Sequence, residues 1–438
     1  MSIIAVIACL VLLILLTARW HFNPFIAFLI TSLAAGVILD MPLDKIPQAI
    51  EKGIGAMLGS LVAIICLGAM FGKLIADSGA AQKITTVLIQ LCGEKYMTWA
   101  LMLTGFIVGI PLFYNVGFVL LVPLVFSVAY QTKLPAVYLG IPLLAALSVT
   151  HGFLPPHPSP TALVPQFNAN MGLTLIYGLI IGLPTMILAG PLFARLLKNI
   201  HCTPLPTFTP ELIAEESLPS SFVSFSIALL PVLMLSFATV LPLMIVESSP
   251  LKPVVTLIGN PMIVMLIALT IASYSLGLKR GMSIKSLMLN YSQGIKDISV
   301  ILLIIAGAGA LKQIFVDSGV SNDIATGLKN IPLNPLFLGW FIAFMIRICL
   351  GSATVAGLTA AGIMAPLVLA NPGINPNLMV LAIGAGSLMC SHVNDSGFWM
   401  FKEYFNLSLR DTFKSWSVME TIVGLSGLVG VLLLDYMI

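Results

Sequence analysis

Residues 136–160 read AVYLGIPLLAALSVTHGFLPPHPSP, an apolar run that stops at a stretch, 151–160, with two histidines, a serine and four prolines. Proline removes a backbone donor and clashes with the preceding turn, so a helix through the apolar run must stop near residues 148–151. The last carbonyls of such a helix have no partners within the helix. What the break means therefore depends on the solvent that surrounds it.

The composition of the chain identifies that solvent as lipid. Of its 438 residues, 59% are hydrophobic and only 8% are charged, which is more apolar surface than a soluble globule can bury. Apolar stretches of about 20 residues, enough to span a hydrocarbon core of about 30 Å, recur along the chain. No alternating pattern typical of a membrane barrel occurs, and unpaired backbone is costly in lipid. The sequence therefore predicts an all-α polytopic membrane protein.

Several classes of function find no support in the residues. The net charge of +3 is small and dispersed, so no nucleic-acid partner is expected. The six cysteines show no CxxC spacing, so neither a metal site nor disulfides are predicted. There is no Walker loop, HExxH or GxSxG motif, which argues against an integral ATPase and against an intramembrane enzyme. We expect no cofactor, and the lipid bilayer as one partner.

Three pairs of related segments indicate an internal duplication. ADSGAAQKI at 76–84 matches VDSGVSNDI at 316–324, VPLV at 122–125 matches APLV at 365–368, and AALSVTHG at 145–152 matches AGSLMCSHV at 385–393. The order is the same and the offset almost constant, a pattern typical of transporters with repeats of inverted topology. We therefore predict a first inverted repeat at 1–200, a cytoplasmic linker at 201–221 and a second repeat at 222–438. We also predict that the paired DSG marks a helix end.

Each half is expected to hold five crossings and one re-entrant hairpin, about ten crossings plus two hairpins in all. In the first half we place two spans, a third span, the hairpin, a broken helix and a last span at about 2–18, 24–40, 53–76, 97–131, 135–168 and 172–196. The basic residues Arg19, Arg195, Lys198, Lys279, Arg280 and Lys285 then fall on one side. By the positive-inside rule, both termini lie outside and the linker is cytoplasmic.

The two broken helices carry the most concentrated polar chemistry. In the first half the candidates are Thr150, His151, His157 and Ser159, and SHVNDSGFW at 391–399 offers His392, Asn394, Asp395 and Ser396. In a two-fold repeat such interruptions meet near the middle of the bilayer, where helix N-termini supply partial positive charge for an anion. A structural alternative remains open, since a buried histidine can simply bond to a free carbonyl at a helix end.

The two hairpins supply the other candidates. GIPLFYNVG at 109–117 contains Tyr114 and Asn115, and RICLGSATVAG at 347–357 contains Arg347, Ser352 and Thr354. An arginine inside an apolar segment costs about 2.5 kcal/mol or more and needs a partner, which a carboxylate ligand or Asp395 could supply. Asp395 is in turn the candidate for proton coupling. The alternatives are that Arg347 snorkels to the surface and that the serine and threonine only pack helices together.

The residues that carry a family resemblance are THGFLPPHPSPTA at 150–162, GFVLLVPLVF at 117–126, GSATVAGLTAAGIMAPL at 351–367 and SHVNDSGFWMFKEYFNL at 391–407. In these segments the chain resembles the gluconate permease family, the gluconate:proton symporters of bacterial inner membranes. The resemblance covers essentially the whole chain. It implies import of a sugar acid anion together with protons, membership of the ion-transporter superfamily, an elevator-like motion and a homodimer.

The resemblance leaves the substrate open. Family relatives also import D-serine, other hexonates, glycerate or fructosamine-type acids, so gluconate is the first expectation among several. At position 115 this chain has Asn115, whereas many members of the family carry an acidic residue there. The difference is expected to change either the substrate that is transported or the group that carries the proton. A cation/proton antiporter is the alternative from another class, but it would need neither Arg347 nor a cluster of hydroxyl groups.

Overall fold

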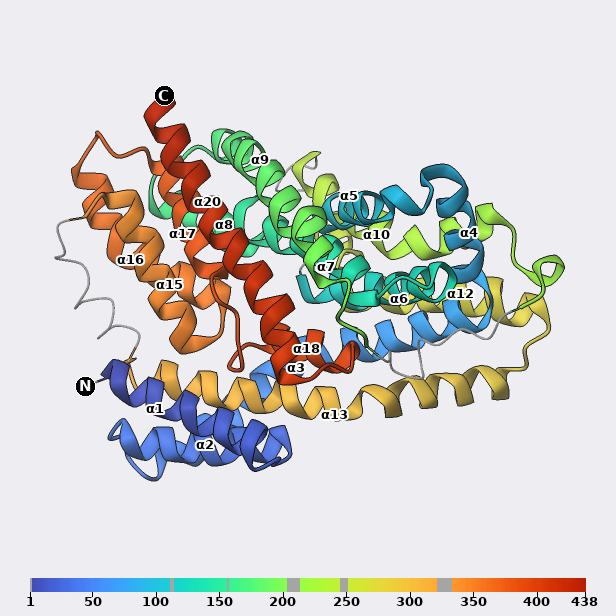
Figure 1. The fold of residues 1–438 in the computed structure, drawn as a ribbon, viewed down its shortest axis with the longest axis horizontal. Helices are drawn as coiled ribbons and strands as arrows, with labels where there is room; N and C mark the ends of the chain where they lie inside the picture. Colours follow the sequence, from blue (N-terminus) through green and yellow to red (C-terminus); the bar gives the residue numbers. More distant parts are fainter. Residues whose placement is uncertain (1, 111–113, 156, 203–212, 245–250, 321–332) are drawn as a thin grey trace. The chain divides into compact units, whose positions relative to one another are not determined.

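The computed structural model describes residues 2–110, 114–155, 157–202, 213–244, 251–320 and 333–438 (Figure 1). Within these ranges the regular structure is entirely helical, as predicted. Eight helices of the described part are long and apolar enough to cross a membrane: Lys45–Asp77, Tyr114–Thr132, Ala136–Phe153, Met171–Leu197, Pro261–Arg280, Ile284–Asp317, Ala353–Ala370 and Leu409–Met437. Shorter apolar helices accompany them. The prediction of an all-α polytopic membrane protein is confirmed.

The first half of the chain follows the predicted order of segments, with one addition. Its helices are α1 (Ser2–Ile14), α2 (Pro24–Ile38), α3 (Lys45–Asp77), α4 (Ala80–Cys92), α5 (Met97–Gly109), α6 (Tyr114–Thr132), α7 (Ala136–Phe153), α8 (Pro158–Gln166) and α9 (Met171–Ile187). Helix α3 begins earlier than predicted because Pro47 lies in its first turn, where a missing N–H costs nothing. Helix α4 was not predicted.

The second half repeats this order of elements. Its helices are α10 (Ser221–Met244), α11 (Leu251–Ile258), α12 (Pro261–Ala272), α13 (Ile284–Asp317), α15 (Pro335–Leu350), α16 (Ala353–Ala370), α17 (Pro376–Leu388), α18 (Ser396–Tyr404), α19 (Leu409–Thr412) and α20 (Val418–Met437). The long helix α13 corresponds to α3, the pair α15–α16 to α5–α6, and the pair α17–α18 to α7–α8. The inverted orientation of the two halves stays a prediction.

The paired DSG segments are helix ends, as predicted. Helix α3 ends at Asp77 and α13 ends at Asp317. Two residues beyond each aspartate, Gly79 and Gly319 have φ of +77° and +74°, the left-handed conformation that ends helices and that glycine adopts at no steric cost.

The chain divides into two compact units. Unit 1 comprises Met1–Gly59, Ser148–Phe193 and Ile301–Ile438, and unit 2 comprises Ser60–Leu147 and Ala194–Val300. Each unit thus takes segments from both halves of the sequence, so the units are not the two predicted repeats. Most of the predicted linker, residues 203–212, lies outside the described residues.

Unit 2 has an apolar core built from α4, α10, α12 and the adjoining parts of α3 and α13. Its buried side chains are Phe71, Leu74, Ile75, Ala80, Ala81, Ile227, Met265, Ala268, Leu269, Ala272, Leu276, Leu287 and Tyr291. No charged side chain belongs to this cluster. Unit 2 is therefore held together by packing around this cluster.

In unit 1, glycines allow the helices around α17 to approach closely. Helix α17 packs against α15, α16 and α20, and a Cβ on Gly386 would collide with the Trp340 carbonyl of α15. The Trp340 indole N–H donates to the Gly424 carbonyl of α20 at 3.0 Å. Small residues at such contacts bring backbones together in membrane proteins. They fix α15, α17 and α20 around the polar residues described next.

Candidate functional site

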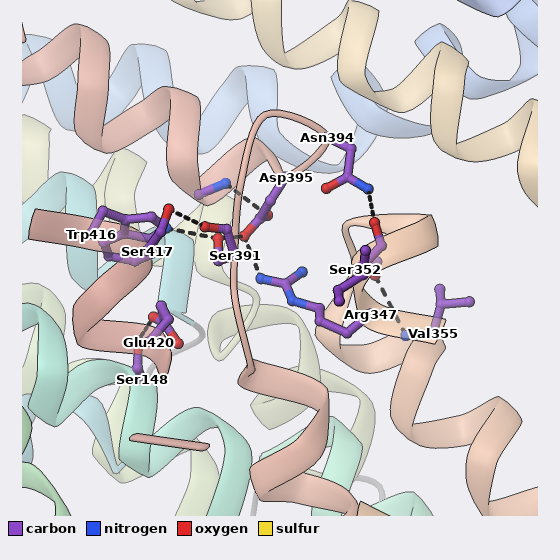
Figure 2. A network of polar contacts seen from close by, with 12 residues as sticks. Ser148, Arg347, Ser352, Val355, Ser391, Asn394, Asp395, Trp416, Ser417 and Glu420 are labelled. Carbon is purple, nitrogen blue, oxygen red and sulfur yellow. Dashed lines mark hydrogen bonds and ion pairs between the residues drawn. The ribbon is translucent and has the colours of Figure 1, made fainter. Parts of the chain in front are cut away.

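A buried ion pair lies where α15 meets the segment between α17 and α18. Arg347, in the last turn of α15, donates to the Asp395 carboxylate (Figure 2), and the two residues are 4% and 8% exposed. The carboxylate also accepts from the Ser391 hydroxyl and, at 3.0 Å, from the Gly397 N–H at the start of α18. Such a pair is stable in an apolar interior only when extra hydrogen bonds satisfy its remaining groups. Of the two predicted partners for Arg347, the structure shows Asp395.

Arg347 is positioned by the way α15 ends. Gly351 follows the helix at a φ of +66°, and its N–H donates to the Arg347 carbonyl at 2.9 Å. The Asn394 amide donates to the Ile348 carbonyl at 2.6 Å and to the Cys349 carbonyl at 3.1 Å. These bonds satisfy carbonyls that a helix end otherwise leaves free. Asn394, predicted to bind substrate, thus caps α15 with its amide nitrogen.

Residues at the start of α20 hold the irregular segment 391–395 in place. The π turn η9 (Phe413–Ser417) leads into α20. From this turn the Trp416 indole N–H donates to the Ser391 hydroxyl at 2.7 Å, and the Ser417 hydroxyl donates to the Ser391 carbonyl at 2.5 Å. Because Ser391 in turn bonds to Asp395, α20 is connected to the ion pair through a chain of hydrogen bonds (Figure 2).

The candidates from the first broken helix belong to the same unit. Thr150 and His151 lie in the last turn of α7, and His157 precedes α8. The two histidine rings pack edge to face with centroids 5.5 Å apart. The Arg347 guanidinium is close enough to act electrostatically on both His151 and His392. The structure therefore brings the two predicted interruptions together around Arg347.

Four further candidates lie at helix N-termini of unit 1. Ser352 precedes α16, and its hydroxyl accepts from the Val355 N–H at 3.5 Å. Thr354 lies in the same first turn, half-buried, and Ser396 is the first residue of α18. Ser159, at the start of α8, packs against α16, because a Cβ on Gly357 would lie 2.9 Å from its hydroxyl oxygen. These hydroxyls therefore surround the ends at which helix dipoles are positive.

The two candidates from the first hairpin, Tyr114 and Asn115, open α6 in unit 2. Both are half-buried, and the Tyr114 ring packs against Phe118 with centroids 6.2 Å apart. Residues 111–113 of the hairpin lie outside the described residues. The role of Tyr114 and Asn115 in binding stays a prediction.

The sequence reasoning did not single out Glu420. This residue lies in the first turn of α20, is 2% exposed and hydrogen-bonds to the Ser148 hydroxyl of α7. The signal was available, because an acidic residue in a long apolar helix is as costly as an arginine. Ser148 and Glu420 are 272 positions apart, so their contact depends on the fold.

Several buried polar atoms in unit 1 have no hydrogen-bond partner among the described residues. They are Arg347 Nε, Asn394 Oδ1, Ser159 Oγ, Thr161 Oγ1 and Glu420 Oε2, together with the hydroxyls of Thr31 and Ser32 in α2. A buried group left unsatisfied costs about 1–3 kcal/mol, so native structures keep few of them without a reason. A guanidinium N–H, an amide oxygen and hydroxyls are groups that suit a small acid bearing hydroxyl groups.

Comparison with known proteins gives matches along the whole chain. The family model of the GntP family permease matches residues 1–437. The high-affinity gluconate transporter of Escherichia coli (strain K12) is 48% identical over 440 residues, covering 100% of both chains. The Gnt-II system L-idonate transporter of the same organism is 44% identical over 436 residues, 99% of each chain, and the gluconate permease of Bacillus subtilis (strain 168) is 43% identical over 449 residues, 100% of each.

Proposed function

Because this chain belongs to the GntP permease family, we propose that it imports gluconate or a closely related sugar acid, together with protons, across the bacterial inner membrane. The family and the apolar helices make it a multi-pass membrane transporter and not an enzyme. The observation that carries the proposal for the substrate is the full-length identity of 48% and 43% with transporters of gluconate.

The electrical work of importing an anion supports proton coupling. Bringing one negative charge into a cell whose interior is negative costs about 2.3 kcal/mol per 100 mV of membrane potential. Uncoupled entry would therefore exclude a sugar acid from the cell. A proton that travels with the anion cancels its charge and removes this cost.

We propose that Arg347 binds the substrate carboxylate. One terminal nitrogen of its guanidinium is engaged by Asp395, while Nε has no partner among the described residues. Guanidinium offers five N–H donors in a planar fork and can bind two carboxylates along different edges. The substrate would thus bind beside Asp395 without displacing it.

The remaining candidate residues would hydrogen-bond to the hydroxyl groups of the substrate. Polar groups at helix ends can donate to and accept from a polyol, and each hydroxyl both donates and accepts. We assign these contacts to Thr150, His151, His157, Ser159, Ser352, Thr354, His392, Asn394 and Ser396 of unit 1. A sugar acid with several hydroxyls satisfies more of these groups than D-serine does.

L-idonate is a second candidate substrate, since a transporter of this acid is 44% identical over 99% of the chain. Idonate and gluconate are hexonates that differ in configuration at one carbon. A single pocket with hydroxyl-bearing walls can therefore hold both, with different affinities.

Counterflow tests the proposal. Purified protein in proteoliposomes loaded with unlabelled gluconate should accumulate labelled gluconate transiently, and liposomes without protein supply the control. Competition by L-idonate, glycerate, D-serine and sodium ions then ranks the substrates. Absence of gluconate counterflow, together with cation/proton exchange in the same liposomes, would establish the antiporter alternative.

The homodimer implied by the resemblance belongs to the same proposal. Mass photometry of the protein in a detergent with small micelles distinguishes a dimer from a monomer of 46.6 kDa. We expect a dimer. Protein that is monomeric by this measurement and still shows gluconate counterflow after reconstitution would contradict the prediction of a homodimer.

A further inference from the structure

Glu420 is a second buried carboxyl close to the ion pair, and its position is well defined. It lies in the first turn of α20, 2% exposed, four residues after Trp416 and three after Ser417. Residues three and four apart share a helix face. Glu420 therefore faces the same side as the two residues that hold Ser391, the hydrogen-bond partner of Asp395.

The two carboxyl groups have different surroundings (Figure 2). Asp395 is ion-paired to Arg347 and accepts two further hydrogen bonds, from Ser391 and from the Gly397 N–H. Among the described residues, Glu420 has one hydrogen bond, to the Ser148 hydroxyl, and no ion pair. Its second oxygen, Oε2, has no partner in that part of the chain.

These surroundings match different protonation states. Three donors, one of them a guanidinium, suit an ionised carboxylate at Asp395. An ionised Glu420 would be a buried charge without a cation partner, which costs several kcal/mol, whereas a protonated carboxyl needs only neutral hydrogen-bond partners. Paired acids whose surroundings differ in this way commonly divide their roles, one staying charged and the other binding protons.

We propose that Glu420, rather than Asp395, is the group that carries the transported proton. This inference rests on the proposed function, proton-coupled import of a sugar acid. The Glu420 carboxylate binds one proton from the outer side, forming an O–H bond, and transport occurs in this neutral form. After the sugar acid has left on the inner side, that bond breaks, the proton passes to water and the carboxylate is restored.

Electrostatics connects the proton to the substrate. The charges that act on Glu420 are those of Arg347 from α15 and Asp395. On the segments that contact Glu420 or pack against α20, the other titratable groups are His151 of α7, Tyr177 of α9, Cys349 of α15, Cys390, His392 and Lys414 of η9, whereas α17 contributes none. A substrate carboxylate bound to Arg347 offsets its positive charge, so an ionised Glu420 loses stabilisation and binds a proton. By linkage, a protonated Glu420 leaves Arg347 free to hold the anion more tightly.

Accumulation in proteoliposomes tests the proposal, with Glu420→Gln as the variant. Glutamine is neutral, has the same shape and still accepts from Ser148, so it imitates the protonated form. At zero membrane potential, one proton per anion allows about tenfold accumulation of gluconate for each unit of inward pH gradient. We expect the wild type to approach tenfold and Glu420→Gln to stay near onefold while it still exchanges labelled for unlabelled gluconate.

Glu403→Gln is the matched control. Glu403 is also an acidic residue of unit 1, but it is half-buried and paired to Lys402 at 2.8 Å. This variant should accumulate gluconate like the wild type. Tenfold accumulation by Glu420→Gln would overturn the inference, and so would a folded Glu420→Gln protein that neither binds nor exchanges gluconate, because the neutral form is the one expected to bind.

The wild type separates this inference from the proposed function. If the wild type shows no gluconate counterflow or no accumulation under a pH gradient, the proposed function itself fails. Should Glu420→Gln not fold, Glu420→Asp replaces it, because the shorter carboxyl withdraws from Ser148 and must change the pH dependence of exchange. An unchanged pH profile in that variant would equally overturn the role of Glu420.

Discussion

Removing both members of the Arg347–Asp395 pair should destabilise the protein by less than the sum of the losses from removing each one alone. Asp395→Asn keeps the size of the side chain and one oxygen, which can still accept from the Gly397 N–H, while the amide nitrogen replaces the oxygen that accepts from Arg347 and Ser391. The variant therefore loses the negative charge that faces Arg347. Arg347 is only 4% exposed, and an uncompensated buried charge costs about 3–5 kcal/mol. Arg347→Gln likewise leaves Asp395 as a buried charge without a partner, and we expect a similar loss of stability.

The double variant carries two neutral amides in place of two charges. Because no charge is then left unpaired, its loss of stability should be about 2–4 kcal/mol smaller than the sum of the two single losses. The measurement is the denaturation midpoint of the purified protein in one detergent, for the wild type, both single variants and the double variant. Lys402→Gln with Glu403→Gln provides the same cycle on a half-buried pair, where coupling of at most about 1 kcal/mol is expected. Additive losses at Arg347 and Asp395 would refute the buried pair as a coupled unit.

Two further predictions concern the end of α15. Gly351→Ala places a Cβ against the Asn394 carbonyl at a left-handed φ of +66°, so we expect the protein to lose more than about 1 kcal/mol of stability. Gly362→Ala is the control, because a Cβ at this helix position would contact no atom within 4 Å, and it should be neutral or stabilising. Equal denaturation midpoints for the two variants would contradict this reasoning. Asn394→Ala removes the donor to the Ile348 and Cys349 carbonyls, and we expect it to destabilise the protein by about 1–3 kcal/mol. The denaturation midpoint measures this loss. An unchanged midpoint would show that water replaces the amide.

Much of the fold follows from local chemistry that a sequence displays. The helix ends at Asp77 and Asp317 are marked by the glycines two residues on, and the break after α7 is marked by prolines. Helix α4 escaped prediction because AAQKITTVLIQLC mixes polar and apolar residues and is shorter than a membrane span. The division into two units could not be predicted from the sequence either, because it depends on which helices pack together, and each unit takes segments from both halves of the chain.

The candidate site was predictable where a residue is out of place in lipid. Arg347 and Asp395 are both costly in apolar surroundings, and the structure pairs them. Glu420 obeys the same rule, yet it lies in a continuous helix, within VMETIVGLSG at 418–427, where no proline or polar interruption draws attention to it. The supporting roles of Trp416 and Ser417 could not be predicted, since tryptophan and serine are ordinary in membrane helices and their hydrogen bonds to Ser391 span 25 and 26 positions.

The affinity for gluconate, measured by titration calorimetry on the wild type and on variants of Arg347, tests most directly whether an acid is bound at this guanidinium. A charge-assisted hydrogen bond is worth about 1.5–3 kcal/mol, so Arg347→Gln should weaken binding by about 10- to 150-fold. Arg347→Lys, which keeps the charge but loses the planar fork, should weaken it less. Lys402→Gln should leave it unchanged. Equal affinities for the wild type and a folded Arg347→Gln protein would contradict the assignment of the substrate carboxylate to this residue.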